Sequence, residues 1–419
     1  MFRATSILLT LFHVTYATYP GDVDHNRAFT GGFTPLSSRS QTGFIPISDS
    51  SETFYWLFFS DRESSNKPLL VWLQGQIGVT SLVGTLLEFT PKWTEHFNLV
   101  FVDAPLGVGF SRAESQSDLA TTSEEIAAQL ITFLEGFFKR HTEFKNPSII
   151  IAGEDYAGHT IPLIVNLAQH TPKVPFKIAG IAVGNGHTHA PIQVITKAES
   201  ATIFGLVDGT CTGDARAHAW RASVLSVIGD SLGSLDQRNL LEQTILNCSK
   251  NINMGNIGQF LPNATIDPSF SKVQEWLKNE EHLSSIGVHA FPPPLVKNFT
   301  VSENLKSDIM RVIWGHIPPI LDAQIPTLWY QGQLDWVDGV YSNEAWINAL
   351  QWSGADEYAS TPRVPWEGGY IRSFGAMNEA MILGAGHLAL VDKPDEVLKL
   401  YKRIFVGTSA ALPEESLVV

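Results

Sequence analysis

Short apolar segments rich in β-branched and aromatic residues recur along this chain and alternate with stretches of helical periodicity. Continuous apolar runs of this length are typical of strands buried on both faces. Their alternation with helices is typical of a largely parallel sheet covered by helices, so the pattern predicts an α/β fold. The expected strands cover residues 54–59, 69–73, 99–102, 148–152, 178–183 and 327–330.

One helix is well marked between the third and fourth expected strands. Thr122 and Glu125 have the spacing of an N-terminal capping box. Apolar residues then return at helical intervals, which predicts a helix with one buried face. These residues are Ile126, Leu130, Phe133, Leu134 and Phe137.

The composition permits a large core and argues against nucleic acid as a partner. The chain has 419 residues, of which 44% are hydrophobic and 17% charged, and its 42 acidic residues outnumber 28 Lys and Arg, for a net charge of −14. Disordered chains are less hydrophobic and more charged, and a phosphate backbone requires clustered basic residues. The length fits two or three domains, or one α/β sheet with an insertion.

The pattern changes between residues 193 and 317. This region has loosely amphipathic segments, polar loops and three consecutive prolines, and sheet-like patterning returns at Ile325. We therefore predict a core made of residues 18–192 and 318–407, a largely helical cap inserted at 193–317, and a fraying tail at 408–419.

The first 17 residues have the pattern of a removed secretory signal peptide. An apolar run from Ile7 to Val14 follows Arg3, and the small residues Thr15 and Ala17 stand where a signal peptidase reads the chain. A membrane anchor, the alternative, needs about 20 apolar residues, and no apolar segment of the sequence is that long. We expect entry into the secretory pathway and no membrane span.

Two further features fit that compartment. Cys211 and Cys248 are the only cysteines, and an oxidising environment favours one disulfide between them over two free thiols. Acceptor sequons begin at Asn247, Asn263 and Asn298. Their clustering in a polar region predicts a glycoprotein, although such triplets also arise by chance.

A glycine-rich segment at 153–158 directly follows an expected strand and leads into a helical pattern. This is the context of a nucleophile elbow, in which the third residue is exposed at the end of the sheet. That residue is Asp155, not serine. With Asp335 after a later strand and His387 in a glycine-rich segment, the chain has the order nucleophile, acid, histidine of α/β-hydrolases. Individually, the three could be a turn aspartate, a second turn aspartate and a solvated loop histidine.

Together these segments resemble the serine carboxypeptidase family from about residue 51 to residue 405. The VWLQG segment at 71–75 is similar to the family's Trp-Leu-Asn/Gln-Gly-Gly-Pro-Gly motif, and DAPLGVGFS at 103–111 matches its next signature closely. GNG at 184–186 and the segments around Asp335 and His387 follow in the family's order. The resemblance, weakest in the cap, implies the α/β-hydrolase fold and, as the family activity, a hydrolase or protease that releases C-terminal residues from peptides.

The departures from the family fall in its reaction centre. Asp155 replaces the nucleophilic serine, and Gln76 replaces the glycine whose backbone N–H helps hold the oxyanion. Tyr156, which the resemblance implies as the second oxyanion donor, remains. So do the side chains that it implies for binding the substrate's terminal carboxylate, namely Gln74, Glu88 and Glu154.

Asp155 is expected to oppose peptide hydrolysis. A serine becomes nucleophilic when histidine takes its proton, and backbone donors hold the resulting oxyanion. An ionised aspartate would instead form an anhydride, and at about 4 Å and an effective dielectric near 20 its repulsion of the oxyanion is on the order of 4 kcal/mol, or roughly a thousandfold in rate. Loss of the serine alone costs about a millionfold in well-studied hydrolases.

Three hypotheses follow for function. The first is an inactive or strongly impaired family member, a pseudoenzyme, whose pocket binds a peptide end or another small molecule. The second is a hydrolase that uses Asp155 covalently on a non-peptide substrate, as dehalogenases and epoxide hydrolases do. It needs leaving-group donors, for which Trp220 and Trp276 are candidates, with packing as their alternative role. The third is residual carboxypeptidase action in which His387 directs water. We expect a secreted or a lysosomal or vacuolar protein.

The remaining motifs predict neither a metal nor a cofactor. His187 and His189 lack a placed carboxylate or thiolate and are interpreted as a solvated loop. Residues 107–109 (GVG) lack the third glycine of a dinucleotide fingerprint. Trp336 and Trp346 are interpreted as core packing.

Charge patterning gives one more expectation. If Asp155 and Asp335 flank His387, both raise its pKa. Glu88 and Glu154 nearby then predict an acidic pocket that, compared with those of its relatives, binds a peptide's terminal carboxylate less well and tolerates a cationic group better.

Overall fold

The computed structural model describes residues 23–25, 36–61, 66–145, 147–260, 269–288 and 294–407. The expected signal peptide at 1–17, the expected tail at 408–419 and the sequon at Asn263 lie outside these residues.

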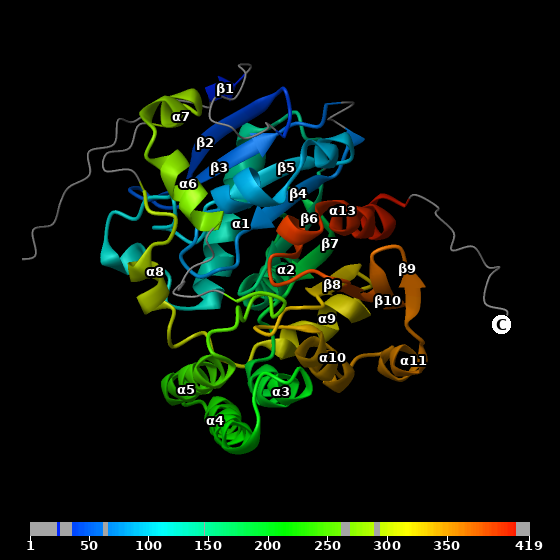
Figure 1. The fold of residues 1–419 in the computed structure, drawn as a ribbon. Helices are drawn as coiled ribbons and strands as arrows, with labels where there is room; N and C mark the ends of the chain where they lie inside the picture. The colour runs from blue at the N-terminus through cyan, green and yellow to red at the C-terminus, as the bar shows by residue number, and fades with distance from the viewer. Residues whose placement is uncertain are drawn as a thin grey trace, which may run out of the picture.

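Within the described chain, eleven strands form one sheet in the order β1-β2-β3-β5-β4-β6-β7-β8-β11-β10-β9 (Figure 1). Its centre, from β5 to β11, is parallel, and the strands at both ends are antiparallel. The six expected strands are all present, with ends that differ by at most two residues. They are β3 (Glu52–Phe58), β4 (Leu69–Leu73), β5 (Asn98–Val102), β6 (Ser148–Glu154), β7 (Lys177–Gly184) and β8 (Thr327–Gly332).

The strands that the sequence did not predict lie toward the two ends of the sheet. Most carry polar residues that interrupt an apolar run, and in β11 two of these, Asn378 and Glu379, are buried. Glu379 is satisfied there by the Tyr358 hydroxyl at 2.8 Å and by Arg363 at 3.1 Å. The unpredicted strands are β1 (Val23–His25), β2 (Ser40–Pro46), β9 (Val364–Trp366), β10 (Gly369–Phe374) and β11 (Met377–Ile382).

The expected helix is confirmed as α1 (Ser123–Arg140), with its predicted apolar positions buried. Thr122 caps it by accepting a hydrogen bond from the Glu125 amide at 3.3 Å. The Glu125 carboxylate accepts from the Thr121 amide at 2.7 Å, one residue earlier than a capping box requires.

The remaining α-helices connect the strands and extend the molecule at one end (Figure 1). They are α2 (Ala157–His170), α3 (Ala190–Ile203), α4 (Gly209–Val227), α5 (Ser231–Ser249), α6 (Ser269–Leu277), α7 (Glu280–Ser285), α8 (Phe299–Asn304), α9 (Pro318–Asp322), α10 (Val340–Ala349), α11 (Ala355–Ser360), α12 (Ala389–Asp392) and α13 (Pro394–Tyr401).

Each face of the sheet has its own apolar core, because alternate residues of a strand point to opposite sides. Tyr55 and Leu57 of β3 belong to the core that includes α1 and α2. Phe54 and Trp56 of the same strand belong to the core on the other face, which includes α6 and α13. The result is a sheet covered by helices on both faces, the α/β-hydrolase architecture that the sequence predicted.

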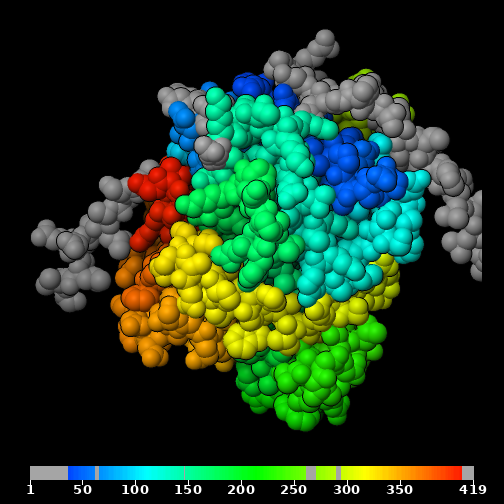
Figure 2. Space-filling model, turned by 180° about the vertical axis from the view of Figure 1, so that it is seen from behind, coloured from blue at the N-terminus to red at the C-terminus, as the bar shows by residue number. Residues whose placement is uncertain are grey.

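The region proposed as a cap contributes to two places. Helices α3, α4 and α5 share a third apolar cluster and form a lobe at one end of the molecule, green at the bottom of Figure 2. Helix α6 instead packs on the sheet, where Trp276 lies 6.3 Å from Trp56 between ring centroids. The limits of the cap stay a proposal. The apolar cluster that α3, α4 and α5 share supports it for these three helices.

Cys211 of α4 and Cys248 of α5 form the predicted disulfide. Two sequons are described. Asn247 is exposed on α5, whereas the half-buried Asn298 donates from Nδ2 to the Gly107 carbonyl at 2.8 Å. Glycosylation remains a prediction. No helix in the described parts of the chain is long and apolar enough to cross a bilayer.

Replacing both cysteines with serine should destabilise the pair α4–α5. The two residues are 37 apart, and closing such a loop contributes about 3–4 kcal/mol on the chain-entropy model. Hydrogen exchange of the native and double-serine proteins should show faster exchange in α4 and α5 and little change in β4 and β6. Equal exchange in α4 and α5 of the two proteins would contradict this expectation.

Candidate active site

Asp155 stands at a sharp turn between β6 and α2 and adopts φ of +50°, a conformation that costs a non-glycine residue of order 1–3 kcal/mol. The neighbouring glycines make the turn possible. A Cβ at Gly153 would lie 2.5 Å from the Leu73 carbonyl oxygen, and one at Gly158 would lie 2.5 Å from Thr188 Oγ1. The Asp155 carbonyl accepts hydrogen bonds from His187 N at 2.7 Å and Gly158 N at 3.0 Å. The elbow geometry is thus intact with an aspartate in the exposed position.

The fold brings Asp155, Asp335 and His387 together, although they come from three distant segments. His387 Nδ1 lies 3.0 Å from Asp335 Oδ2, which is hydrogen-bond distance, and Nε2 lies 3.8 Å from Asp155 Oδ2, which is an ion-pair distance. The imidazole therefore has a carboxylate on each side. His387 is only 8% exposed, so its alternative interpretation as a solvated loop histidine is wrong.

Backbone and side-chain donors fix both ends of this arrangement. Asp335 accepts from the Asn185 amide at 2.7 Å and from the Val337 backbone at 2.7 Å. The His387 backbone N–H donates to the Gly255 carbonyl at 2.6 Å. The acid and the imidazole are held by groups outside the pair, so they do not depend on Asp155 for their position.

Electrostatics makes Asp155 and His387 a charged pair. Burial by itself would lower the pKa of His387, but the charges of Asp335 and Asp155 and their hydrogen bonds raise it well above its ordinary value. Burial by itself would raise the pKa of Asp155, but the hydrogen bond and charge of His387 hold it below its ordinary value. The expectation of a raised histidine pKa is confirmed.

The implied oxyanion donors Gln76 and Tyr156 lie on the same cleft as Asp155. Within the described residues, neither backbone N–H donates to a protein acceptor. The loop before Gln76 is closely packed, since a Cβ at Gly75 would overlap the Glu154 carbonyl oxygen at 1.3 Å. The Tyr156 hydroxyl donates to the buried carboxylate of Asp308. Both residues therefore line the cleft with backbone donors that no described acceptor occupies.

Gln74, Glu88 and Glu154 form a buried cluster behind the elbow. Gln74 Nε2 lies 2.5 Å from Glu154 Oε1 and 3.1 Å from Glu88 Oε1. Burial raises the pKa of Glu154 to about 7, and burial together with the charge of Glu154 raises that of Glu88 well above its ordinary value. The raised pKa values favour the neutral forms of both glutamates, so this cluster is less acidic than expected, and the ligand preference stays a prediction.

Asp155 lies on a cleft of about 320 Å³ whose wall includes helix α5 and the segment around α8. Sequence analysis missed Arg238, Lys297 and Lys306, which line it. Little in the sequence indicated this cationic wall, because its three residues are far apart along the chain. Of the residues considered for leaving-group stabilisation, Trp220 is 60% exposed on α4 and Trp276 packs under the sheet, and neither lines this cleft.

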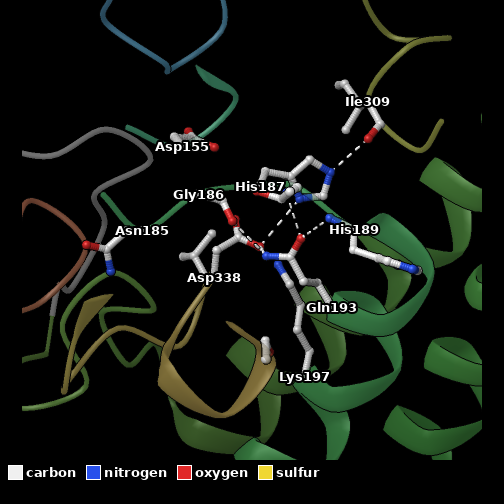
Figure 3. A network of polar contacts seen from close by, with 12 residues as sticks. Asp155, Asn185, Gly186, His187, His189, Gln193, Lys197, Ile309 and Asp338 are labelled. Carbon is white, nitrogen blue, oxygen red and sulfur yellow. Dashed lines mark hydrogen bonds and ion pairs between the residues drawn. The ribbon is translucent and has the colours of Figure 1, made fainter. Parts of the chain in front are cut away.

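His187 and His189 are buried, so their interpretation as a solvated loop is wrong. The ring of His187 contacts the Ile309 carbonyl through Nε2 at 2.8 Å and approaches Asp338 through Nδ1 at 3.4 Å. Gln193 of α3 accepts from the His189 backbone at 2.6 Å (Figure 3). These contacts fasten the loop after β7, which carries the donor to the Asp155 carbonyl.

Two other motif interpretations concerned core packing and metal binding. Trp336 and Trp346 are buried in packing, as predicted. Among the described residues there is no group of three His, Cys, Asp or Glu side chains that could hold a metal ion.

Asp155→Asn should move the NMR titration midpoint of His387 to lower pH, because one of two flanking charges is removed. The stability of the fold also depends on the charges of Asp155 and His387. The raised pKa of His387 stabilises the fold fully below about pH 6.5 and the lowered pKa of Asp155 does so above about pH 4. The pair's contribution to the unfolding free energy is therefore largest between these limits and disappears as the pH rises through the folded pKa of His387. An unchanged midpoint in the variant would show that the two side chains are not coupled.

Comparisons with known proteins agree with the motifs. The family model for serine carboxypeptidase matches residues 31–407. Serine carboxypeptidase-like 50 of Arabidopsis thaliana is 28% identical over 385 residues, or 84% of each chain. A probable serine carboxypeptidase CPVL of Dictyostelium discoideum is 25% identical over 86% of this chain and 77% of its own. The crystal structure of Kex1(delta)p, a prohormone-processing carboxypeptidase of Saccharomyces cerevisiae, has the same fold, with a TM-score of 0.77, 19% identity and coverage of 87% and 90%. The chain belongs to the serine carboxypeptidase family.

Proposed function

We propose that this protein is a serine carboxypeptidase-family member without ordinary peptidase turnover, which binds a peptide end or a related small molecule. The observation that carries the proposal is the carboxylate of Asp155 at the nucleophile position, paired with His387 at 3.8 Å. Within the described residues, no hydroxyl lies within hydrogen-bond distance of His387 Nε2.

The charge state of the pair argues against acyl chemistry in two ways. Asp155 is ionised, and its charge would repel the oxyanion that the Gln76 and Tyr156 amides would hold. His387 is held as an imidazolium by its raised pKa, so it has no free lone pair with which to accept a proton from a nucleophile or from water. Both the attacking group and the general base are therefore unavailable over the pH range in which the pair is charged.

Several donors support the proposed binding. At mildly acidic pH a protonated Glu154 can donate a hydrogen bond to a ligand carboxylate, with Gln74 Nε2 beside it. Gln76 and Tyr156 line the cleft beside Asp155. These donors support recognition of a carboxylate at the end of a chain.

Covalent use of Asp155 on a non-peptide substrate is less well supported. A dehalogenase-type mechanism needs donors for the leaving group and a neutral histidine for the following hydrolysis. Trp220 and Trp276 do not line the cleft, and His387 is paired as a cation. We keep this mechanism, and residual water-directed peptidase action, as outcomes of the experiments below.

We also propose that the protein passes through the secretory pathway. The Cys211–Cys248 disulfide supports this proposal, because such bonds persist in oxidising compartments.

A carboxypeptidase assay at acidic pH should find turnover by the native chain far below that of Gln76→Gly/Asp155→Ser, by roughly 10⁵–10⁶-fold if the double variant regains the full serine mechanism. Asp155→Ser alone should fall between them. Adding His387→Ala to the double variant is the control that ties its activity to the triad. Native turnover equal to that of the double variant would refute the proposal, and isotope from labelled water entering Asp155 would favour the covalent mechanism.

A fluorescently labelled peptide with a free C-terminus should bind more weakly as the pH rises through about 7, because Glu154 then loses the proton that it donates. The same peptide with a C-terminal amide should bind weakly and with little pH dependence. Glu154→Gln, which donates at every pH, should remove the dependence. Equal binding of acid and amide peptides would show that this cluster does not recognise the carboxylate.

A further inference from the structure

The cleft beside Asp155 is cationic, although the chain as a whole carries a net charge of −14. Three cations line it, Arg238, Lys297 and Lys306, against two carboxylates, Asp155 and Glu242. One of these carboxylates, Asp155, is already matched by His387. The charge left in the cleft is therefore positive.

Lys297 has a fixed backbone position beside the oxyanion loop. It forms an antiparallel bridge with Val79, and on either side Thr80 N donates to the Val296 carbonyl at 3.0 Å and Asn298 N donates to the Gly78 carbonyl at 2.8 Å. Gly78 permits this approach, since a Cβ there would lie 2.4 Å from the Asn298 carbonyl oxygen. The lysine is thus held on the wall next to Gln76.

The Lys297 ammonium has no carboxylate within 4.0 Å among the residues that the structure describes. Its recorded contact is with the Phe299 ring, 5.8 Å from Nζ to the centroid. Lys306, in contrast, pairs with Glu303 at 2.6 Å. Of these two lysines, Lys297 is therefore the one whose ammonium can pair with an anionic ligand.

Arg238 lines the cleft from α5 and is already paired. Its side chain is 14% exposed, and Nε donates to Glu242 Oε1 at 2.9 Å. The same oxygen lies 3.5 Å from the ammonium of the buried Lys197. Glu242 is thus shared between two cations, but the buried carboxylate of Asp338 also acts on Lys197 and Arg238. The unbalanced positive charge of the cleft therefore lies on Lys297.

We propose that the cleft selects a peptide whose last residue is acidic, with the side-chain carboxylate of Asp or Glu meeting Lys297. This inference rests on the proposed binding of a peptide end and adds its substrate class. A cleft of about 320 Å³ accommodates a group of this size, and charge-assisted hydrogen bonds are the strong ones in such a site. This preference runs against the greater tolerance of a cationic group that the sequence predicted.

The test uses labelled peptides that are identical except for a last residue of Glu, Gln or Lys, at pH 6 and low salt, where the Glu side chain is ionised and Glu154 still holds a proton. We expect the Glu peptide to bind about tenfold more tightly than the Gln peptide, the ratio that one net charged hydrogen bond gives. The Lys peptide should bind most weakly. The ratio should fall as salt is added.

Lys297→Gln should bring the ratio of Glu to Gln peptides close to one, and Lys297→Glu should reverse the order of Glu and Lys peptides. Lys139→Gln, at an exposed position of α1, is the matched control and should leave the ratio unchanged. Thermal unfolding of each variant checks that the fold is retained.

The outcomes separate the two proposals. If no peptide binds, the proposed function fails, and this inference fails with it. If the peptides bind equally, or if the Lys peptide binds best, a peptide-end pocket stands and the acidic preference is refuted. A Glu preference that survives both Lys297 variants also refutes the role assigned to this residue.

Discussion

A single imidazole held between two carboxylates is the interaction on which the chemistry of this protein depends. In a site built for acyl transfer, one carboxylate orients histidine and the other side is open to a neutral hydroxyl. Here Asp335 keeps its orienting contact at 3.0 Å, and Asp155 occupies the other side at 3.8 Å. The second charge stabilises the protonated ring, so the substitution changes the state of the histidine as well as the identity of the nucleophile.

The surroundings of this pair differ chemically on its two sides. Behind the elbow, burial raises the pKa of Glu154 to about 7 and that of Glu88 above its ordinary value, which favours their neutral forms as hydrogen-bond donors. In the cleft beside Asp155, Lys297 supplies positive charge. A ligand bound as proposed would place its terminal carboxylate beside donors and a second anionic group beside Lys297. This division supports recognition more than turnover.

Sequence reasoning succeeded where the constraint was local. The elbow could be predicted because Gly153 and Gly158 permit a turn that side chains would block, and the buried strands could be predicted because their apolar runs are continuous. It failed where distant segments supply the partner. Glu379 is buried because Tyr358 and Arg363 satisfy it, and His187 is buried because Ile309 and Asp338 surround it. The cationic wall combines residues 238, 297 and 306, which no local pattern connects.

The lobe made of α3, α4 and α5 has its own apolar cluster, separate from the two that cover the sheet. Its small residues, Ala215, Ala219 and Ala222, let the helices approach one another without help from the sheet. Arg238 and Glu242 face the cleft from this lobe. The lobe is nevertheless joined to the site, because Trp336, the residue after Asp335, belongs to its cluster and donates to the Lys197 carbonyl of α3 at 3.0 Å. Substitutions on the cleft-facing side of α5 would change ligand choice, whereas substitutions in the core of the lobe would also shift the acid of the triad.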